Sequence, residues 1–159
     1  MKKLLLIPFF ILSVLAFISC NKSIIFDETV GFANDNWSFE EKSQTFEIFL
    51  KSSETPYSIV LDLELTETLN VNMFYATFTI ITPSGGKTTK SILFNFAHQD
   101  EHYVKNTSSK EKTYRLIVYP KRYFSETGTY SFEVNQFSNK ADNYGIRALR
   151  MYIEQVKDN

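Results

Sequence analysis

The sequence contains a single cysteine, Cys20, so no disulfide can form within the chain and the domain has to be stabilised by its hydrophobic core. Positive charge is not in excess either, because 17 Lys and Arg stand against 18 Asp and Glu. Without a clustered basic face the chain lacks the electrostatic footprint of a nucleic-acid-binding protein. No internal repeat, low-complexity stretch or long helical pattern is present. These absences direct attention to the few patterns that do occur.

A long hydrophobic run occurs once, at the N-terminus. Lys2 and Lys3 precede a nearly unbroken apolar stretch from Leu4 to Phe17. A small residue then stands before Cys20, and this order is typical of a lipoprotein signal peptide covering residues 1–19. The Cys20 thiol would take a diacylglycerol and the freed amine a further acyl chain such as palmitate. At about 0.8 kcal/mol per buried CH2, two or three chains hold a protein on a bilayer.

An ordinary secretory leader and an uncleaved membrane helix are the alternatives to lipidation. The apolar stretch is shorter than the roughly 20 residues that a membrane span needs, and it contains Pro8, so lipidation at Cys20 is favoured. Asn21-Lys22-Ser23 follows the cysteine without an acidic run, which favours an anchor that faces the periplasm. The expected location is therefore the cell envelope, with the protein held on a membrane through acylated Cys20.

The mature chain has room for one domain. Removing residues 1–19 leaves about 140 residues, enough for one core. The leader holds Lys2 and Lys3 and no acid, so 15 basic and 18 acidic residues remain, a net charge of −3. Residues 20–45 are polar without sustained periodicity and predict a tether and a loop leading into the domain. The folded domain is expected over residues 46–159.

From Phe46 onward, apolar residues alternate with polar ones at period two, which predicts strands with one buried and one solvent-facing side. Dense turn residues from Thr82 to Lys87 predict a hairpin. A polar excursion from His98 to Lys112 follows the second strand of this hairpin. Pro120 is expected to end the strand that comes after this polar segment. The inward-facing series are Phe46 to Leu50, Tyr57 to Leu65, Phe74 to Ile80, Ile92 to Phe96, Tyr114 to Val118 and Tyr130 to Gln136.

The last segment, Ala148 to Val156, places Leu149, Met151 and Ile153 on one face and predicts a strand, although Ala-Leu-Arg-Met also suits a helix. About seven short strands without a long helix predict an all-β fold, an antiparallel β-sandwich of jelly-roll-like type. The 15 Phe and 9 Tyr can supply its core.

His98-Gln99-Asp100-Glu101-His102 matches the H-x-x-E-H pattern of an inverted zinc protease. That chemistry needs the two histidines one helical turn apart and a third protein ligand. Here the pentapeptide directly follows a period-two strand and leads into the loop-like Asn106 to Ser109. We therefore expect a solvated loop with independently titrating histidines and no metal site, with adventitious or structural metal binding and zinc catalysis as the alternatives.

Two further motif matches, to a phosphate-binding loop and to a glycosylation sequon, are weak. Gly86-Lys87-Thr88 resembles the end of a phosphate-binding loop, but Ile81 occupies the position of the first glycine and the segment joins two strands. Asn106-Thr107-Ser108 is a glycosylation sequon, which is uninformative behind a bacterial-type leader. No nucleophile occupies a recognisable elbow. The sequence thus predicts a protein without a catalytic site or cofactor.

Four aromatic residues lie in or beside loops: Trp37, Phe39, Tyr103 and Tyr144. Aromatic side chains in the loops of a sandwich can anchor a protein partner or stack on sugar rings. These four are therefore the candidate partner or ligand contacts, and a lipid-anchored carbohydrate-binding sandwich is the alternative function. The other interpretation is that the four rings cap the open ends of the sandwich.

The order of several weak motifs behind the leader resembles the GldH family of gliding-motility lipoproteins. The resemblance is strongest in the Gly128-Thr129-Tyr130-Ser131-Phe132 motif with Gln136, and in Tyr144-Gly145-Ile146 leading to the strand that ends in Ile153-Glu154. Trp37, Phe46 with Ile48, Tyr57 with Leu61 and Pro83-Ser84-Gly85 extend it over most of the mature chain. It implies a non-enzymatic envelope lipoprotein that acts as a protein-binding scaffold with other proteins of a gliding or linked export machinery.

Overall fold

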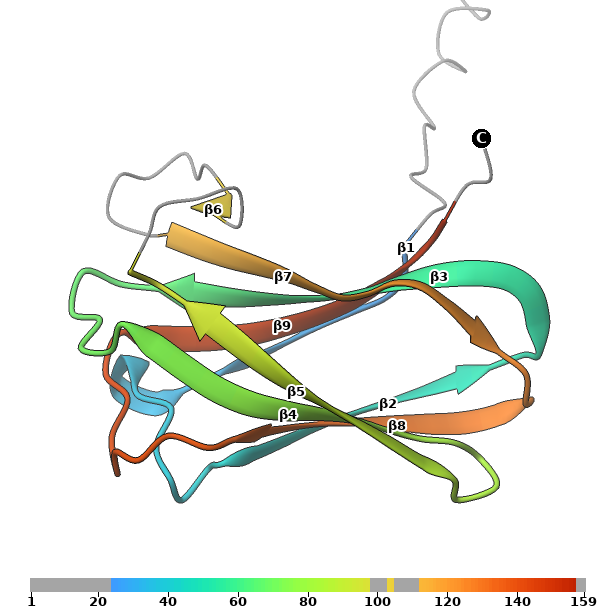
Figure 1. Cartoon of the computed structure of the whole chain (residues 1–159), viewed down its shortest axis with the longest axis horizontal. Coiled ribbons are helices and arrows are strands. Elements are labelled where there is room, and N and C mark those ends of the chain that lie inside the picture. Colours follow the sequence, from blue (N-terminus) through green and yellow to red (C-terminus); the bar gives the residue numbers. More distant parts are fainter. Residues whose placement is uncertain (1–23, 98–102, 105–111, 157–159) are drawn as a thin grey trace, which may run out of the picture.

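The protein is a sandwich of two antiparallel sheets (Figure 1), described by a computed structural model over residues 24–97, 103–104 and 112–156. The predicted all-β sandwich is confirmed. One sheet has five strands in the order β1 (Ile24–Gly31), β9 (Ile146–Gln155), β3 (Ser53–Leu65), β7 (Lys112–Phe124) and β6 (Tyr103–Val104). The other has four, in the order β2 (Ser43–Leu50), β8 (Gly128–Gln136), β4 (Met73–Ile81) and β5 (Lys87–Asn95).

The chain changes sheet at nearly every connection. Among the described strands there are two exceptions: the two-residue β6 and β7 stay in one sheet, and so do β4 and β5, which form the hairpin predicted over Thr82–Lys87. Gly85 closes that turn at φ 87°, and its N–H donates to the Thr82 carbonyl at 2.8 Å. Apart from the two-residue β6, this alternation of successive strands between the two sheets encloses a common core and gives an antiparallel β-sandwich.

Most of the core is formed by residues that the period-two pattern assigned to the inner faces. Leu61, Phe78, Phe132 and Met151 are fully buried where the two sheets meet. Aromatic rings fill much of the interior, with Phe78 and Phe132 at 6.0 Å between centroids. The last segment is strand β9, and its inward residues are buried as predicted.

The prediction of a tether and loop over residues 20–45 is wrong for Ile24–Gly31, which form strand β1, and for residues 43–45, where β2 begins. Strand β1 starts at Ile24 and pairs with β9, with Phe26 opposite Ile153 and Val30 opposite Leu149. The sandwich thus begins more than twenty residues before Phe46. As an edge strand β1 packs only Phe26 and Val30 against the core, four residues apart, so its alternation was too sparse to detect.

Two further expectations about strands are corrected. β7 does not end at Pro120 but continues to Phe124. Since β6 pairs only with Thr113 and Tyr114, β7 is an edge strand around Pro120, where a residue without an N–H is tolerated. The predicted solvent-facing side of β3 is also largely covered, because Val60 and Asp62 are buried in the middle of the five-stranded sheet.

The polar excursion predicted between His98 and Lys112 lies mostly outside the described residues. Within the described part of the chain, the only helix is the short 3-10 turn η1 (Ala33–Asp35), and no helix is long and apolar enough to cross a membrane.

Candidate functional site

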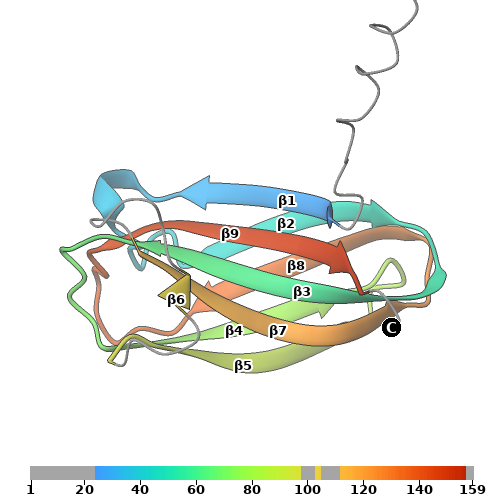
Figure 2. The same cartoon turned by 90° about the horizontal axis from the view of Figure 1, so that it is seen from above.

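The sandwich has two ends, which differ in their loops and in their exposed side chains. Ile24, where β1 starts, pairs with Glu154 near the end of β9, and we call this the proximal end because it is nearest in sequence to Cys20. The distal end lies at the other end of β1, roughly 25 Å away at about 3.3 Å per residue. It consists of the segments 32–42, 66–72 and 137–145, which gather on one side of the molecule (Figure 2).

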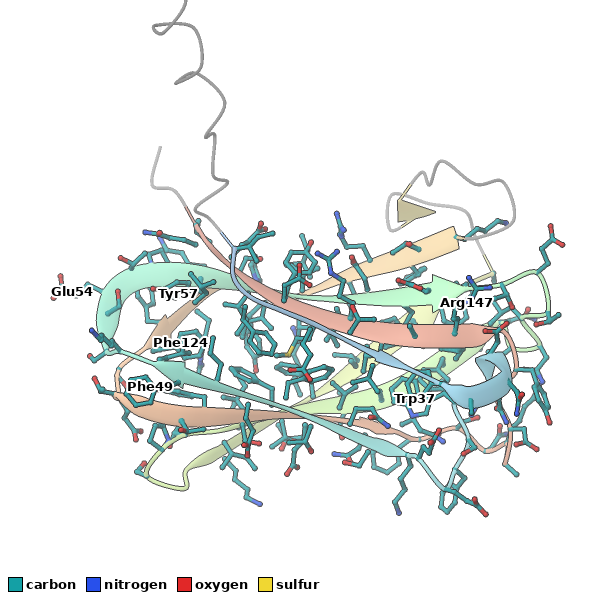
Figure 3. All side chains as sticks on the ribbon, turned by 180° about the vertical axis from the view of Figure 1, so that it is seen from behind. Trp37, Phe49, Glu54, Tyr57, Phe124 and Arg147 are labelled. Carbon is teal, nitrogen blue, oxygen red and sulfur yellow. The ribbon has the colours of Figure 1, made fainter. Side chains whose placement is uncertain are left out.

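Trp37 belongs to the core and not to a contact surface. Its side chain lies at the distal end of the sandwich (Figure 3). The ring is fully buried, stacked on Phe32 at 4.7 Å between centroids and tilted against Phe74 at 5.1 Å. Its Nε1–H donates to the Glu41 carbonyl at 2.8 Å, which satisfies the indole while it is buried. The prediction of Trp37 as a partner contact is therefore wrong, because the loop folds back over the open end of the sandwich.

Asn143 holds the loops of the distal end together. Its fully buried side chain donates from Nδ2 to the Trp37 carbonyl at 2.9 Å and accepts from Ser138 Oγ at 2.6 Å. Its backbone N–H donates to Asn36 Oδ1 at 2.8 Å. A buried side chain that makes all of these hydrogen bonds rigidifies the loops that it joins, because each of its polar groups would be costly to leave unpaired. The sequence alone offered no signal for Asn143.

Tyr144 is presented on a fixed backbone. Its carbonyl accepts from the Asn70 N–H at 3.1 Å, and it forms an isolated bridge with Asn36. Gly145, next in the chain, has φ 88° and donates from its N–H to the Asp35 carbonyl at 2.8 Å. The Tyr144 side chain is 46% exposed, so a rigid frame holds an accessible aromatic ring.

Phe39 also remains a candidate contact. Its side chain is exposed, its N–H donates to the Ala141 carbonyl at 2.9 Å, and the Lys42 ammonium lies 5.0 Å from its ring centroid. Tyr103 takes part in the fold through its backbone, which pairs in β6 with Tyr114. The Tyr103 side chain, Cys20, and the H-x-x-E-H residues His98, Glu101 and His102 lie outside the described residues.

The structure adds an exposed apolar cluster, the distal apolar patch, made of Met73, Tyr75, Leu93 and Phe137. Tyr75 on β4 lies directly opposite Leu93 on β5, and the Phe137 N–H donates to the Tyr75 carbonyl at 2.8 Å. All four side chains are exposed, Phe137 at 65%. A shallow pocket adjoins the patch and is lined by Asn70, Val71, Asn72, Met73, Tyr75, Phe137, Ser138, Asn139 and Lys140.

The sequence does contain a signal for this patch. Residues on the outer face of a half-exposed strand are expected to be polar. Met73 and Tyr75 occupy outer positions of β4 that alternate with the buried Phe74 and Ala76, yet both are apolar or aromatic. Four exposed apolar side chains that meet across three neighbouring segments are typical of an interaction surface, whereas single exposed ones are not.

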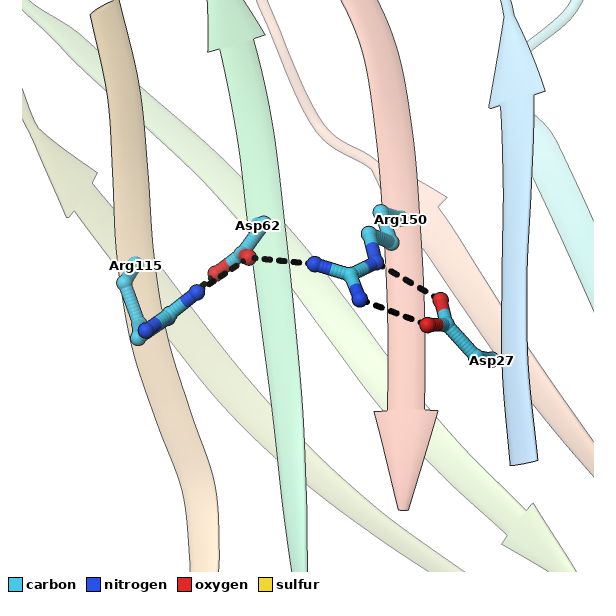
Figure 4. A network of polar contacts seen from close by, with 4 residues as sticks. All are labelled: Asp27, Asp62, Arg115 and Arg150. Atoms are coloured by element: carbon cyan, nitrogen blue, oxygen red, sulfur yellow. Dashed lines mark hydrogen bonds and ion pairs between the residues drawn. The ribbon is translucent and has the colours of Figure 1, made fainter. Parts of the chain in front are cut away.

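A ladder of charges crosses the outer face of the five-stranded sheet (Figure 4). Arg150 donates from Nε and Nη2 to the two Asp27 carboxylate oxygens, both at 2.6 Å, and its Nη1 lies 3.5 Å from Asp62 Oδ2. Arg115 donates from Nε and Nη2 to Asp62 at 2.8 Å each. Two arginines and two aspartates thus link β1, β9, β3 and β7.

Three groups in this ladder, Asp27, Arg115 and Arg150, have pKa values shifted toward the charged form. The hydrogen bond from Arg150 lowers the pKa of Asp27, and the hydrogen bond to Asp62 raises the pKa of Arg115. Burial raises the pKa of Tyr152, whose ring lies under the Arg150 guanidinium at 4.8 Å. Groups held charged near neutral pH do not transfer protons readily, so the ladder serves to fasten strands together.

In the described part of the chain, no group of three or more His, Cys, Asp or Glu is placed to hold a metal ion. What the described residues bring together is an exposed apolar and aromatic surface at the distal end, on loops that hydrogen bonds hold in place. The fold and this surface define a β-sandwich of the kind that can bind a partner through its loops and one sheet face.

Comparison with known proteins gives the family. The sequence profile of the GldH lipoprotein family matches residues 24–153, most of the chain, and the chain belongs to this family. The resemblance seen in the sequence is thereby confirmed. Membership in a lipoprotein family makes this a membrane-anchored protein of the cell envelope. No curated protein matches the chain.

Two solved structures are similar in fold. One is a carbohydrate-binding module specific for non-crystalline cellulose, at 14% identity and a TM-score of 0.42, with 82% of this chain and 72% of that one covered. The other is the VP2 subviral particle of infectious bursal disease virus, at 13% identity and a TM-score of 0.38, with 82% and 32% covered. The chain spans about a third of the viral protein's length, and both similarities concern the fold alone.

Proposed function

We propose that this protein is a non-enzymatic scaffold of the cell envelope, acylated at Cys20, that binds other envelope proteins of a gliding-motility and linked export machinery. The observation that carries the proposal is the distal apolar patch, at the end of the sandwich opposite the start of β1. Such a position leaves the patch accessible to a partner while the other end is held at the membrane.

The composition of the distal end supports protein binding. Interfaces are enriched in aromatic residues and Met at their centre and are surrounded by a polar rim. Met73, Tyr75 and Phe137 provide the centre, and Asn70, Asn139 and other residues of the adjoining pocket provide the rim. The frame made by Asn143 and Gly145 limits the loop ordering that binding would otherwise cost.

The test uses matched phenylalanines. Phe137, 65% exposed, lies in the distal apolar patch, and Phe49, 62% exposed, lies on β2 near the proximal end of the same sheet. Phe137→Ser, alone and with Tyr75→Ser, and Phe49→Ser are each introduced into a host whose own copy is deleted. We expect the deletion to impair cell spreading and export, and the patch variants to restore them poorly while Phe49→Ser restores them fully.

The same variants are compared by in-cell cross-linking to neighbouring envelope proteins. Specific cross-links that Phe137→Ser reduces and Phe49→Ser retains would support the scaffold. If the deletion strain spreads and exports normally, the assignment to the machinery fails. If Phe137→Ser and Phe49→Ser behave alike, the distal apolar patch is not the binding surface.

A carbohydrate-binding module is the second candidate function. The observation in its favour is a second shallow pocket at the distal end, in which exposed Phe39 lies beside Asn34, Asn36 and Asp142. An aromatic ring next to amide and carboxylate groups is suited to a sugar hydroxyl face. A glycan array probed with the protein and with Phe39→Ala tests it: a hit lost in the variant supports this candidate, and no hit removes it.

A further inference from the structure

The distance between the proposed lipid anchor and the folded domain is short. Cys20 precedes Ile24, the first residue of β1, by four residues. Four peptide units span at most about 14 Å even when fully extended. The polar headgroup region takes up part of that reach, since it adds roughly 5 to 8 Å on each side of the hydrocarbon core. The proximal end of the sandwich therefore stays at the membrane surface.

Side chains suited to that environment lie at the proximal end. Ile24 and Ile25 are both 39% exposed at the start of β1, where the register with β9 shifts. Tyr123 is 51% exposed near the end of β7, with the Lys121 ammonium 5.8 Å from its ring centroid. We call these four residues the proximal surface.

The proximal surface extends across the proximal end of the five-stranded sheet, from β1 to β7. Ile24 is opposite Glu154 on β9, Glu154 is opposite Ser58 on β3, and Tyr57 is opposite Arg122, which adjoins Tyr123. Three strand spacings of about 4.8 Å separate β1 from β7, so the isoleucines and Tyr123 lie about 14 Å apart. They can contact one flat surface at the same time.

We propose that the proximal surface rests on the lipid headgroups of the bilayer that holds the acyl chains, with Ile24, Ile25 and Tyr123 inserted at the interface. Aromatic and aliphatic side chains prefer this zone, and lysine extends its ammonium toward the headgroups while its stem stays on apolar surface. This contact orients the sandwich and directs the distal apolar patch away from the membrane. The inference rests on the proposed acylation of Cys20.

The test places a fluorophore on single added cysteines in the full, acylated chain. Tyr123→Cys and Ile25→Cys report on the proximal surface from two different strands. Tyr144→Cys is the matched distal control, because Tyr144 is 46% exposed and Tyr123 is 51% exposed. Each labelled protein is reconstituted into phosphatidylethanolamine and phosphatidylglycerol vesicles that contain a lipid with a spin label on its headgroup. The emission of buried Trp37, recorded before labelling, verifies the fold of each variant.

We expect the spin-labelled headgroups to quench the fluorophore at positions 25 and 123 several-fold more than at position 144. Equal quenching at all three positions, or stronger quenching at position 144, would overturn the proposed orientation. The acylation of Cys20, on which the proposal rests, is tested separately in the parent protein, whose one thiol is Cys20. If Cys20 is acylated, the parent takes up no fluorophore and floats with the vesicles. A parent that labels and does not float refutes the anchor, and the proposed orientation fails with it.

Discussion

Asn143 Nδ2 donates a hydrogen bond of 2.9 Å to the backbone carbonyl of Trp37, a residue 106 positions earlier in the chain. The bond joins the loop after β8 to the loop after β1 and closes the distal end over the core. A short polar side chain thus decides that the only tryptophan becomes part of the core and that Phe39 and Tyr144 stay outside it.

Replacing Asn143 with alanine should lower the free energy of unfolding by about 2 to 3 kcal/mol, because the Trp37 carbonyl and the Ser138 hydroxyl lose a buried partner. Urea denaturation measures this. Asn139→Ala, an exposed asparagine in the same loop, is the control and should change stability little. Equal effects of the two substitutions would mean that the buried hydrogen bonds contribute nothing.

Trp37 should behave as a core residue in solution. Its emission should be shifted to the blue and resist quenching by iodide, and Trp37→Ala should cost about 3 to 5 kcal/mol of stability through the cavity beside Phe32 and Phe74. Both measurements use the single tryptophan of the chain. Efficient iodide quenching in the native protein would contradict its burial.

Alanine substitutions at two glycines distinguish the cost of backbone strain from the cost of steric crowding. Gly85 and Gly145 have nearly the same positive φ, 87° and 88°, but a Cβ at Gly85 would meet open space, whereas at Gly145 it would meet the backbone of Leu69. Gly85→Ala should therefore cost about 1 kcal/mol, and Gly145→Ala considerably more, because the backbone has to move. Thermal or urea unfolding of the two variants decides this, and equal costs would contradict the close approach at Gly145.

The pair of Asp27 and Arg150 should make stability depend on acidic pH. The hydrogen bond from Arg150 lowers the folded-state pKa of Asp27 below its ordinary value of 3.8, so its contribution is present above that value and disappears as pH falls through the folded pKa. Asp27→Asn should lower stability by about 1 kcal/mol or less at neutral pH, as exposed ion pairs do. The difference from the parent should vanish in strong acid, and urea denaturation of the two proteins across acidic pH measures it.

Cys20→Ala should release the protein from membranes without unfolding it, because the substitution lies before β1 and leaves every described strand unchanged. Incorporation of labelled palmitate and fractionation after an alkaline wash are the measurements. A variant that stays with the membrane through the wash would show that something other than the acyl chains anchors the protein.

The sequence by itself determined which residues face the core. Period-two alternation is a local property of a strand, so Phe46, Phe78, Phe132 and Met151 could be assigned to the inside before any strand was placed. The turn residues around Gly85 likewise located the β4 to β5 hairpin, because positive φ is a local requirement. The lipoprotein family was also recognisable, since its motifs depend on order and spacing along the chain.

Only the tertiary structure decided which strands became neighbours and what covered their outer faces. Asp62 reads as solvent-facing in sequence, yet it is buried because β3 lies between β7 and β9 and their arginines meet over it. Strand β1 owes its place to pairing with β9, more than a hundred residues later. Tyr75, Leu93 and Phe137 form a patch because β4 pairs with both β5 and β8. Such contacts join distant segments, and alternation within one segment carries no information about them.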